Sequence, residues 1–203
     1  MTEPTFPKRD PASEEFWNLR YGARFCPWDA GDVPQRLREF VATESASRRV
    51  LVPGCGSARD VRHFAANGWD VRGIDFSAQA VDIARMELGA FADRVELGDF
   101  FAPIAGEPFD IVYERAFLCS LPRRLWPAWG ERMAGLVAPR GLLVGFFFFD
   151  DGERGPPFAL HSSDELATLL DPAFTRVEDK AVADSLAVFR DRERWQVWHR
   201  SAA

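Results

Sequence analysis

The 203-residue chain is poor in the residues that build metal sites and disulfide frameworks. It has three histidines and three cysteines, and none of them forms a His-x-x-x-His or Cys-x-x-Cys pair. Cys26, Cys55 and Cys119 lie far apart and are odd in number, which is typical of a protein from a reducing compartment. The sequence therefore predicts no metal site, no disulfide and a cytoplasmic location.

Positive charge and long apolar segments are also scarce. There are 25 basic and 31 acidic residues, a net charge of −6, and lysine occurs only at Lys8 and Lys180. Without a basic cluster, a nucleic-acid backbone is not expected as a partner. The longest apolar run, residues 141–149, is too short to cross a bilayer, and the polar, proline-rich start does not resemble a signal peptide. We expect no membrane partner.

What the chain does contain is a regular alternation of strand and helix patterns. We expect strands over 48–54, 69–75, 93–99, 109–115 and 140–149, with helices over 58–68, 78–91 and 125–137 between them. This order predicts a Rossmann-like, doubly wound α/β fold with a mostly parallel sheet. A helix over 162–170 is followed by strands at 174–183 and 193–200, which predict an antiparallel C-terminal hairpin and seven strands in all.

A glycine-rich turn follows the first expected strand in the sequence "VLVPGCGSARD". In doubly wound sheets the ligand lies at the carboxyl ends of the strands, where glycine permits close approach and positive φ. Asp75 ends the second strand 19 residues after Gly56, a spacing typical of a carboxylate that binds ribose hydroxyls. The third glycine of a dinucleotide fingerprint is replaced by Arg59, so the pyrophosphate-binding version of the turn is incomplete.

A second acid follows the third strand in "GDFF". Asp99 is placed to accept a hydrogen bond from an adenine amino group, with Phe100 beside the ring. The Gly-x-Gly turn, Asp75 and Asp99, each at a strand end, together indicate S-adenosylmethionine. The alternative is that both aspartates only cap the following helix or turn, as Asp often does.

Several short motifs occur in order between about Phe16 and Phe158: "PWDAG", "LVPGCGSARD", "GIDFS", "GDFF", "FDIVYERAFLCSL", "PAWGERM" and "GPPF". Together they resemble the thiopurine S-methyltransferase family, and most closely its plant halide/thiol methyltransferase branch. The resemblance implies a class I S-adenosylmethionine-dependent methyltransferase that acts on a small molecule. It also implies one domain over residues 1–203, in which residues 1–33 form a helix and a lid over the cofactor.

The resemblance implies a set of cofactor contacts. Gly54 would border the methionine part, Asp75 would bind the ribose, and Asp99 with Phe100 would hold the adenine. Trp17 and Trp28 match tryptophans that close over the cofactor in the plant enzymes, although both residues would also serve as ordinary core anchors. Between them, Tyr21 stands where the plant enzymes have another tryptophan.

Arg115 is the one candidate catalytic residue. It matches a position that is tyrosine in the plant branch and arginine in the animal thiopurine enzymes. It would bind the carboxylate of the cofactor or favour an anionic acceptor. Glu114, beside it, would hold the amino group of the cofactor or pair with an arginine.

Methyl transfer to a soft anion is an in-line displacement that needs alignment and exclusion of water rather than a protein base. An aromatic content of 13% and the lack of a His–acid pair agree with this chemistry. We therefore expect an enzyme that methylates a thiol, thiopurine, hydrosulfide or halide, with one or two rings at the end of Phe146–Phe149 reaching the substrate. A monomer is expected because no exposed apolar stripe stands out in the sequence. The alternatives are an O- or N-methyltransferase and a non-catalytic cofactor-binding protein.

Overall fold

A computed structural model describes residues 4–29, 31–44, 48–189 and 191–202. Its sheet has seven strands in the order β3-β2-β1-β4-β5-β7-β6. The strands are β1 (Arg49–Pro53), β2 (Asp70–Asp75), β3 (Val95–Leu97), β4 (Phe109–Arg115), β5 (Val137–Phe148), β6 (Phe174–Ala181) and β7 (Glu193–Arg200). Strands β1 to β5 pair in parallel, whereas β7 runs antiparallel to both β5 and β6. The predicted doubly wound sheet with an antiparallel C-terminal hairpin is confirmed.

Six α-helices accompany the sheet in the described part of the chain: α1 (Glu14–Gly22), α2 (Gln35–Thr43), α3 (Arg59–Ala66), α4 (Ala78–Leu88), α5 (Trp126–Leu136) and α6 (Ser163–Leu170). The helix expected over 78–91 ends at Leu88 because Gly89, with φ +54°, leaves the helical conformation. None of the described helices is long and apolar enough to cross a membrane.

The sheet is buried on both faces because successive residues of a strand point to opposite sides. On β5, Val144 and Phe146 pack into the core beneath α2, α3 and α4. Leu143 and Phe147 pack into the core beneath α5 and α6. The phenylalanine run is therefore divided between the two sides of the sheet, which explains why Phe146, Phe147 and Phe148 are buried although they are adjacent, while Phe149 is half-buried.

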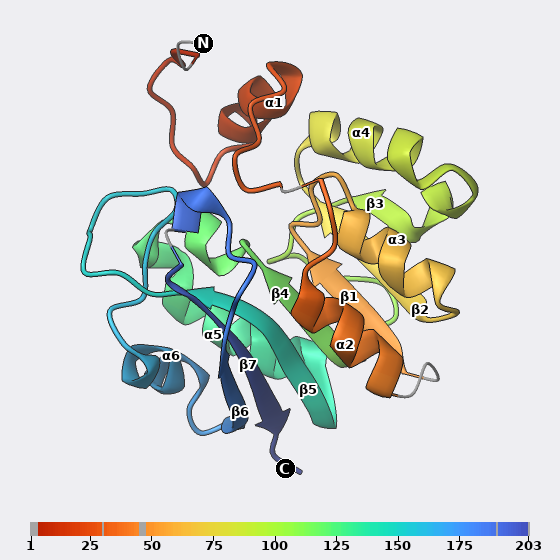
Figure 1. Cartoon of the computed structure of the whole chain (residues 1–203), viewed down its shortest axis with the longest axis vertical. Coiled ribbons are helices and arrows are strands. Elements are labelled where there is room, and N and C mark those ends of the chain that lie inside the picture. The colour runs from red at the N-terminus through yellow and green to blue at the C-terminus, as the bar shows by residue number, and fades with distance from the viewer. Residues whose placement is uncertain (1–3, 30, 45–47, 190, 203) are drawn as a thin grey trace.

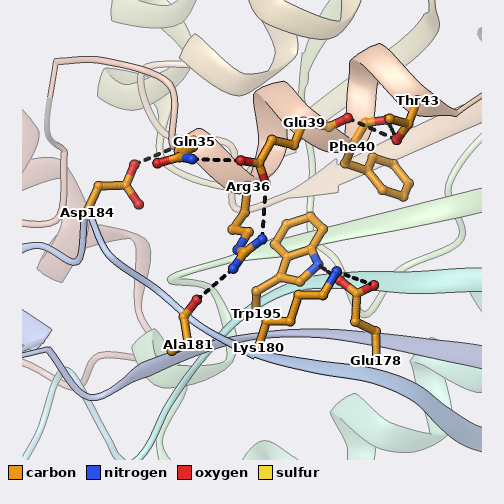
Figure 2. Close-up of polar contacts among 10 residues, drawn as sticks. All are labelled: Gln35, Arg36, Glu39, Phe40, Thr43, Glu178, Lys180, Ala181, Asp184 and Trp195. Atoms are coloured by element: carbon orange, nitrogen blue, oxygen red, sulfur yellow. Dashed lines mark hydrogen bonds and ion pairs between the residues drawn. The ribbon is translucent and has the colours of Figure 1, made fainter.

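Helix α2 is attached to the antiparallel edge of the sheet (Figure 2). The ring of Phe40 lies 5.8 Å from that of Trp195 on β7, and Arg36 donates hydrogen bonds to Glu39 and to the carbonyl of Ala181. At the start of the helix, the N–H of Gln35 donates to the carboxylate of Asp184. These contacts fix the point at which the N-terminal segment joins the rest of the fold.

The segment before α2 lies at the carboxyl ends of the parallel strands. Figure 1 shows α1 and the N-terminal coil at one end of the sheet, with the C-terminus at the opposite end. Asn18 on α1 accepts hydrogen bonds from the hydroxyl of Ser77 at 2.7 Å and from the N–H of Gln79. Because these residues stand at the start of α4, directly after β2, α1 is held above the edge where the sequence predicts a ligand.

Candidate functional site

A cavity of about 1040 Å³ opens at the carboxyl ends of the parallel strands. Its volume is at the upper end of the range for small-molecule sites, so it has room for a cofactor and an organic acceptor. All eight residues singled out in the sequence line it: Trp17, Tyr21, Trp28, Gly54, Asp75, Asp99, Phe100 and Arg115. They come from α1, from the loop after it and from the ends of four strands. The tertiary structure therefore brings the whole predicted set together.

The turn after β1 requires glycine at two positions. Gly54 has φ +58° and Gly56 has φ +53°, a conformation that is unfavourable for residues with a Cβ atom. A Cβ atom on Gly54 would overlap the ring of Phe117, and one on Gly56 would lie 2.7 Å from the hydroxyl of Tyr21. The turn is thus held tightly between two aromatic side chains that line the cavity.

Asp75 is the most constrained of the predicted side chains. Its two carboxylate oxygens accept hydrogen bonds from the N–H groups of Gly56 and Ser77, each at 2.9 Å, and the side chain remains in the cavity wall. Burial raises the pKa of Asp75 to about 6, although these N–H bonds act in the opposite direction. Each oxygen has a second lone pair, so the carboxylate is able to accept two hydroxyl donors from a vicinal diol.

Asp99 and Phe100 follow β3 at the edge of the cavity. The carboxylate of Asp99 is exposed and accepts a hydrogen bond from the N–H of Phe101 at 2.9 Å, a turn-capping role. The ring of Phe100 is buried and packs edge-on against Phe101 and Phe117. The capping role leaves the other oxygen of Asp99 available to a ligand, so it does not decide between the two interpretations drawn from the sequence.

Three aromatic side chains, Trp17, Tyr21 and Trp28, form the wall of the cavity beside the glycine turn. The rings of Trp17 and Tyr21 pack edge-on against Trp28, with centroid distances of 5.4 and 5.8 Å. The indole N–H of Trp28 donates to the hydroxyl of Tyr21 at 3.3 Å, and that of Trp17 donates to the carbonyl of Pro11. This cluster presents aromatic surface over the strand ends.

Arg115 extends from the end of β4 into the cavity. Its guanidinium lies 4.7 Å from the ring centroid of Phe146, and the side chain is half-buried. Burial alone would lower the pKa of Arg115, but Tyr113 and the carboxylates of Asp60 and Glu193 outweigh it and raise the pKa. Among the described residues, no carboxylate lies within ion-pair distance of the guanidinium, which lines the cavity.

Several other expectations need correction. None of Phe146–Phe149 lines the large cavity. Phe146 and Phe147 point to the cores on opposite faces of the sheet, and Phe148 packs against Phe189. Within the described residues, Glu114 neither lines the cavity nor pairs with an arginine. Its buried carboxylate accepts hydrogen bonds from the N–H groups of Phe117 and Leu118, and it thereby fixes the turn that carries Phe117.

The structure adds three residues that the sequence analysis did not place in the site. The carboxylate of Asp29 accepts hydrogen bonds from the hydroxyl of Ser57 at 2.6 Å and from Nε of Arg59 at 3.0 Å. All three line the cavity. The sequence signal was present, since Asp29 belongs to "PWDAG" and Arg59 breaks the dinucleotide fingerprint, but their pairing across 30 residues is visible only in the fold. Ala30 of that motif lies outside the described residues.

Comparison with known proteins identifies the family of the chain. Residues 12–201 match the family model of thiopurine S-methyltransferases. The chain is 30% identical to the probable thiol methyltransferase 2 of Arabidopsis thaliana over 178 residues, covering 85% of this chain and 78% of the relative. It is 34% identical to a thiopurine S-methyltransferase of Pseudomonas fluorescens over 176 residues, covering 76% of this chain and 80% of the relative.

Among solved structures, the fold resembles that of magnesium protoporphyrin IX methyltransferase from Synechocystis with bound S-adenosylhomocysteine. The TM-score is 0.73 at 17% identity, and the match covers 93% of this chain and 97% of that one. The sequence-based resemblance is confirmed by the family model and by plant and bacterial relatives alike. The chain belongs to the thiopurine S-methyltransferase family and is an S-adenosylmethionine-dependent methyltransferase.

Proposed function

We propose that this enzyme transfers the methyl group of S-adenosylmethionine to a small soft nucleophile (a thiol, thiopurine, hydrosulfide or halide) by in-line displacement. The observation that carries the proposal is the chemistry of the cavity wall, which is rich in aromatic rings and, over the described residues, has no histidine. A thiolate or halide already has the attacking lone pair, so such a wall suffices for it. Relatives named thiol and thiopurine methyltransferases support the same acceptor class.

The residues at the strand ends fit the proposed cofactor. Asp75 offers a buried carboxylate with two spare acceptor positions for the ribose hydroxyls. Asp99 and Phe100 border the position of the adenine, and Gly54 leaves the backbone accessible to the methionine part. Aromatic faces attract cations, so Trp17, Tyr21 and Trp28 suit a positively charged sulfonium. When bound, S-adenosylmethionine supplies an electrophilic methyl group on that sulfonium.

The protein would align the two reactants, exclude water from them and supply one fixed cation, Arg115. Residues 4–33, apart from Ala30, form the proposed lid, and its aromatic rings would exclude water from the reacting centre. Positioning two reactants in this way lowers the barrier by several kcal/mol. Arg115 is placed to bind the carboxylate of the cofactor or to stabilise an anionic acceptor. As a neighbouring cation, it would also lower the pKa of an acceptor thiol and increase its thiolate fraction.

Asp60 favours a second class of acceptor, an oxygen or nitrogen nucleophile. This carboxylate lines the cavity, and burial raises its pKa to about 6 while Arg115 partly opposes the rise. A carboxylate with such a pKa is suited to act as a general base near neutral pH, which an O- or N-methyl transfer would require. If Asp60→Asn abolishes turnover of an oxygen or nitrogen acceptor while a thiol is still methylated, this second class gains support.

Cofactor binding and acceptor choice are tested separately. Isothermal calorimetry with S-adenosylmethionine, S-adenosylhomocysteine and NAD should show binding of the first two only, and selective NAD binding would overturn the proposal. An acceptor screen with iodide, hydrosulfide, an aryl thiol and a thiopurine, alongside a phenol and an amine, should give turnover with the soft nucleophiles. Cofactor binding without turnover of any acceptor would indicate a non-catalytic family member.

A further inference from the structure

We propose that Asp29 is a positioning residue that latches the lid onto the glycine turn, so that Trp28 stays closed over the cofactor. The inference deepens the proposed function and rests on it, because the latch matters only if the cavity holds the cofactor. It gives a role to two sequence features that the proposed chemistry leaves unexplained: the aspartate of "PWDAG" and the arginine in "GCGSARD".

The latch joins two segments that are distant in the sequence. One oxygen of Asp29 accepts from the hydroxyl of Ser57 at 2.6 Å, and the other accepts from Nε of Arg59 at 3.0 Å and from the N–H of Gly31 at 2.9 Å. Asp29 and Arg59 are both half-buried, with side-chain exposures of 22% and 35%. A charge-assisted pair in such a place is stronger than a fully exposed surface ion pair.

The ionisation of Asp29 agrees with this arrangement. Burial alone would raise its pKa, but the hydrogen bonds from Ser57 and Gly31 and the charge of Arg59 outweigh that effect and lower it. The carboxylate is therefore charged at neutral pH. Arg59 is also the first residue of α3, so the carboxylate of Asp29 lies near the N-terminal end of that helix, where negative charge is favourable.

A closed ring of contacts connects the latch to the aromatic wall. Trp28 precedes Asp29, and its indole N–H donates to the hydroxyl of Tyr21. That hydroxyl lies directly over Gly56, and Ser57 is the next residue of the turn. Fixing Asp29 on Ser57 therefore fixes Trp28 against Tyr21, and both rings are held at the same strand ends as Asp75.

A separate tether holds α1, and this separation makes the latch testable. Asn18 binds Ser77 and Gln79 at the start of α4 and does not involve Asp29. Loss of Asp29 should therefore release the loop that carries Trp28 and leave α1 in place. The exposed Arg24, between the tether and the latch, offers a trypsin site whose accessibility reports on the state of this loop.

The experiment compares Asp29→Asn with Ser57→Ala, Arg59→Gln and the double variant Asp29→Asn/Arg59→Gln. Asp70→Asn is the matched control, because Asp70 forms a 2.8 Å pair with Arg94 outside the cavity. Three quantities are measured for each protein: the Kd for S-adenosylhomocysteine by calorimetry, the rate of trypsin cleavage after Arg24 with and without that ligand, and the unfolding midpoint without ligand.

If the latch operates, Asp29→Asn raises the Kd about tenfold or more, as expected for loss of a charge-assisted hydrogen bond. It also removes the ligand's protection of Arg24, while the ligand-free protein remains folded and unfolds in a single transition. The Kd of the double variant is no higher than the higher of the Kd values of Asp29→Asn and Arg59→Gln. A further variant, Ser57→Thr, keeps the hydroxyl and should have the Kd of the wild type.

The proposal is overturned if Asp29→Asn binds as tightly as Asp70→Asn, if its ligand-free midpoint collapses, or if S-adenosylhomocysteine does not slow cleavage after Arg24 in the wild type. Absence of S-adenosylhomocysteine binding by the wild-type protein is a different failure. It would overturn the proposed function itself, and the other three outcomes leave that function standing.

Discussion

The carboxylate of Asp75 accepts a hydrogen bond from the backbone N–H of Gly56, with an N–O distance of 2.9 Å. The end of β2 is thereby fixed to the glycine turn that follows β1, so the two strand ends keep one geometry in the cavity wall. Burial raises the pKa of Asp75 to about 6 although this bond opposes the rise, so the charge of the carboxylate changes near that pH.

Binding of S-adenosylhomocysteine should weaken as the pH falls below about 6. The ionised carboxylate of Asp75 is able to accept hydrogen bonds from both ribose hydroxyls. The protonated acid has an O–H group that faces one of these donors, so ligand binding requires loss of that proton. The Kd should rise by up to about tenfold for each pH unit below the pKa of Asp75. Asp75→Asn should bind about 10–100-fold more weakly at pH 7.5, equivalent to roughly 1.5–3 kcal/mol.

Calorimetry between pH 5 and 8 gives both results. Asp60→Asn is the control, since the pKa of Asp60 is also raised to about 6. If Asp75→Asn retains the pH dependence and Asp60→Asn loses it, Asp60 is the controlling group. Unchanged affinity in Asp75→Asn would remove Asp75 from the ribose role.

Gly54→Ala should destabilise the protein more than Gly68→Ala. Both glycines have positive φ, at +58° and +81°, so both substitutions incur the conformational cost of about 1 kcal/mol. A Cβ atom on Gly68 has no neighbour within 4 Å, whereas on Gly54 it meets the ring of Phe117. Overpacking there should add about 1–3 kcal/mol to the loss. Urea unfolding measures the difference, and equal losses would show that Phe117 moves aside without cost.

Arg115→Ala should leave the protein folded but impair turnover or acceptor preference. It should also reduce the free energy of unfolding by about 1–3 kcal/mol at pH 8, because Asp60 and Glu193 lose the cation that favours their ionised forms. At pH 5 the loss should be smaller, since Asp60 is then largely protonated. The double variant Asp60→Asn/Arg115→Ala should recover part of the stability.

Unfolding curves at the two pH values, together with kinetics for every active acceptor, test these expectations. Arg115→Lys is the comparison for kinetics, because it keeps the charge and loses the planar contact with Phe146. Arg115 would be a structural residue if its alanine variant kept normal kinetics with all acceptors and lost only stability.

Glu114→Gln should remove part of the pH dependence of stability. Burial raises the pKa of Glu114 from 4.5 to about 7, so the folded state favours the neutral acid. The unfolded state releases its proton first as the pH rises. The contribution of Glu114 to the free energy of unfolding therefore decreases between about pH 4.5 and 7, with a slope of up to about 1.4 kcal/mol per pH unit.

The glutamine variant keeps one oxygen, at the position of Oε1, which accepts from the N–H groups of both Phe117 and Leu118, so the turn should persist. Its stability relative to the wild type should increase from pH 4.5 to 7 and then remain constant, as measured by thermal or urea unfolding. A constant difference across this range would mean that Glu114 does not titrate there.

Local patterns in the sequence were sufficient to predict the fold and the edge of the sheet at which the cavity opens. The alternation of strand and helix patterns requires a parallel sheet, and in such a sheet ligands bind at the carboxyl ends of the strands. Gly54, Asp75, Asp99 and Arg115 occupy strand ends, so their approach to one cavity followed from topology alone. The turn glycines were recognisable because few other residues adopt positive φ.

Only the tertiary structure decided which side chains face one another across long separations. Nothing in the sequence indicated that Asp29 pairs with Arg59 30 residues later, or that Glu114 turns from the cavity to hold Phe117. Contrary to the sequence-based expectation, Phe146–Phe149 does not line the cavity, because alternation along β5 sends its rings to separate cores. The spacing of residues along the sequence shows which of them lie at the same edge of the sheet. Which side chains bind one another depends on how the lid and the loops fold back over that edge.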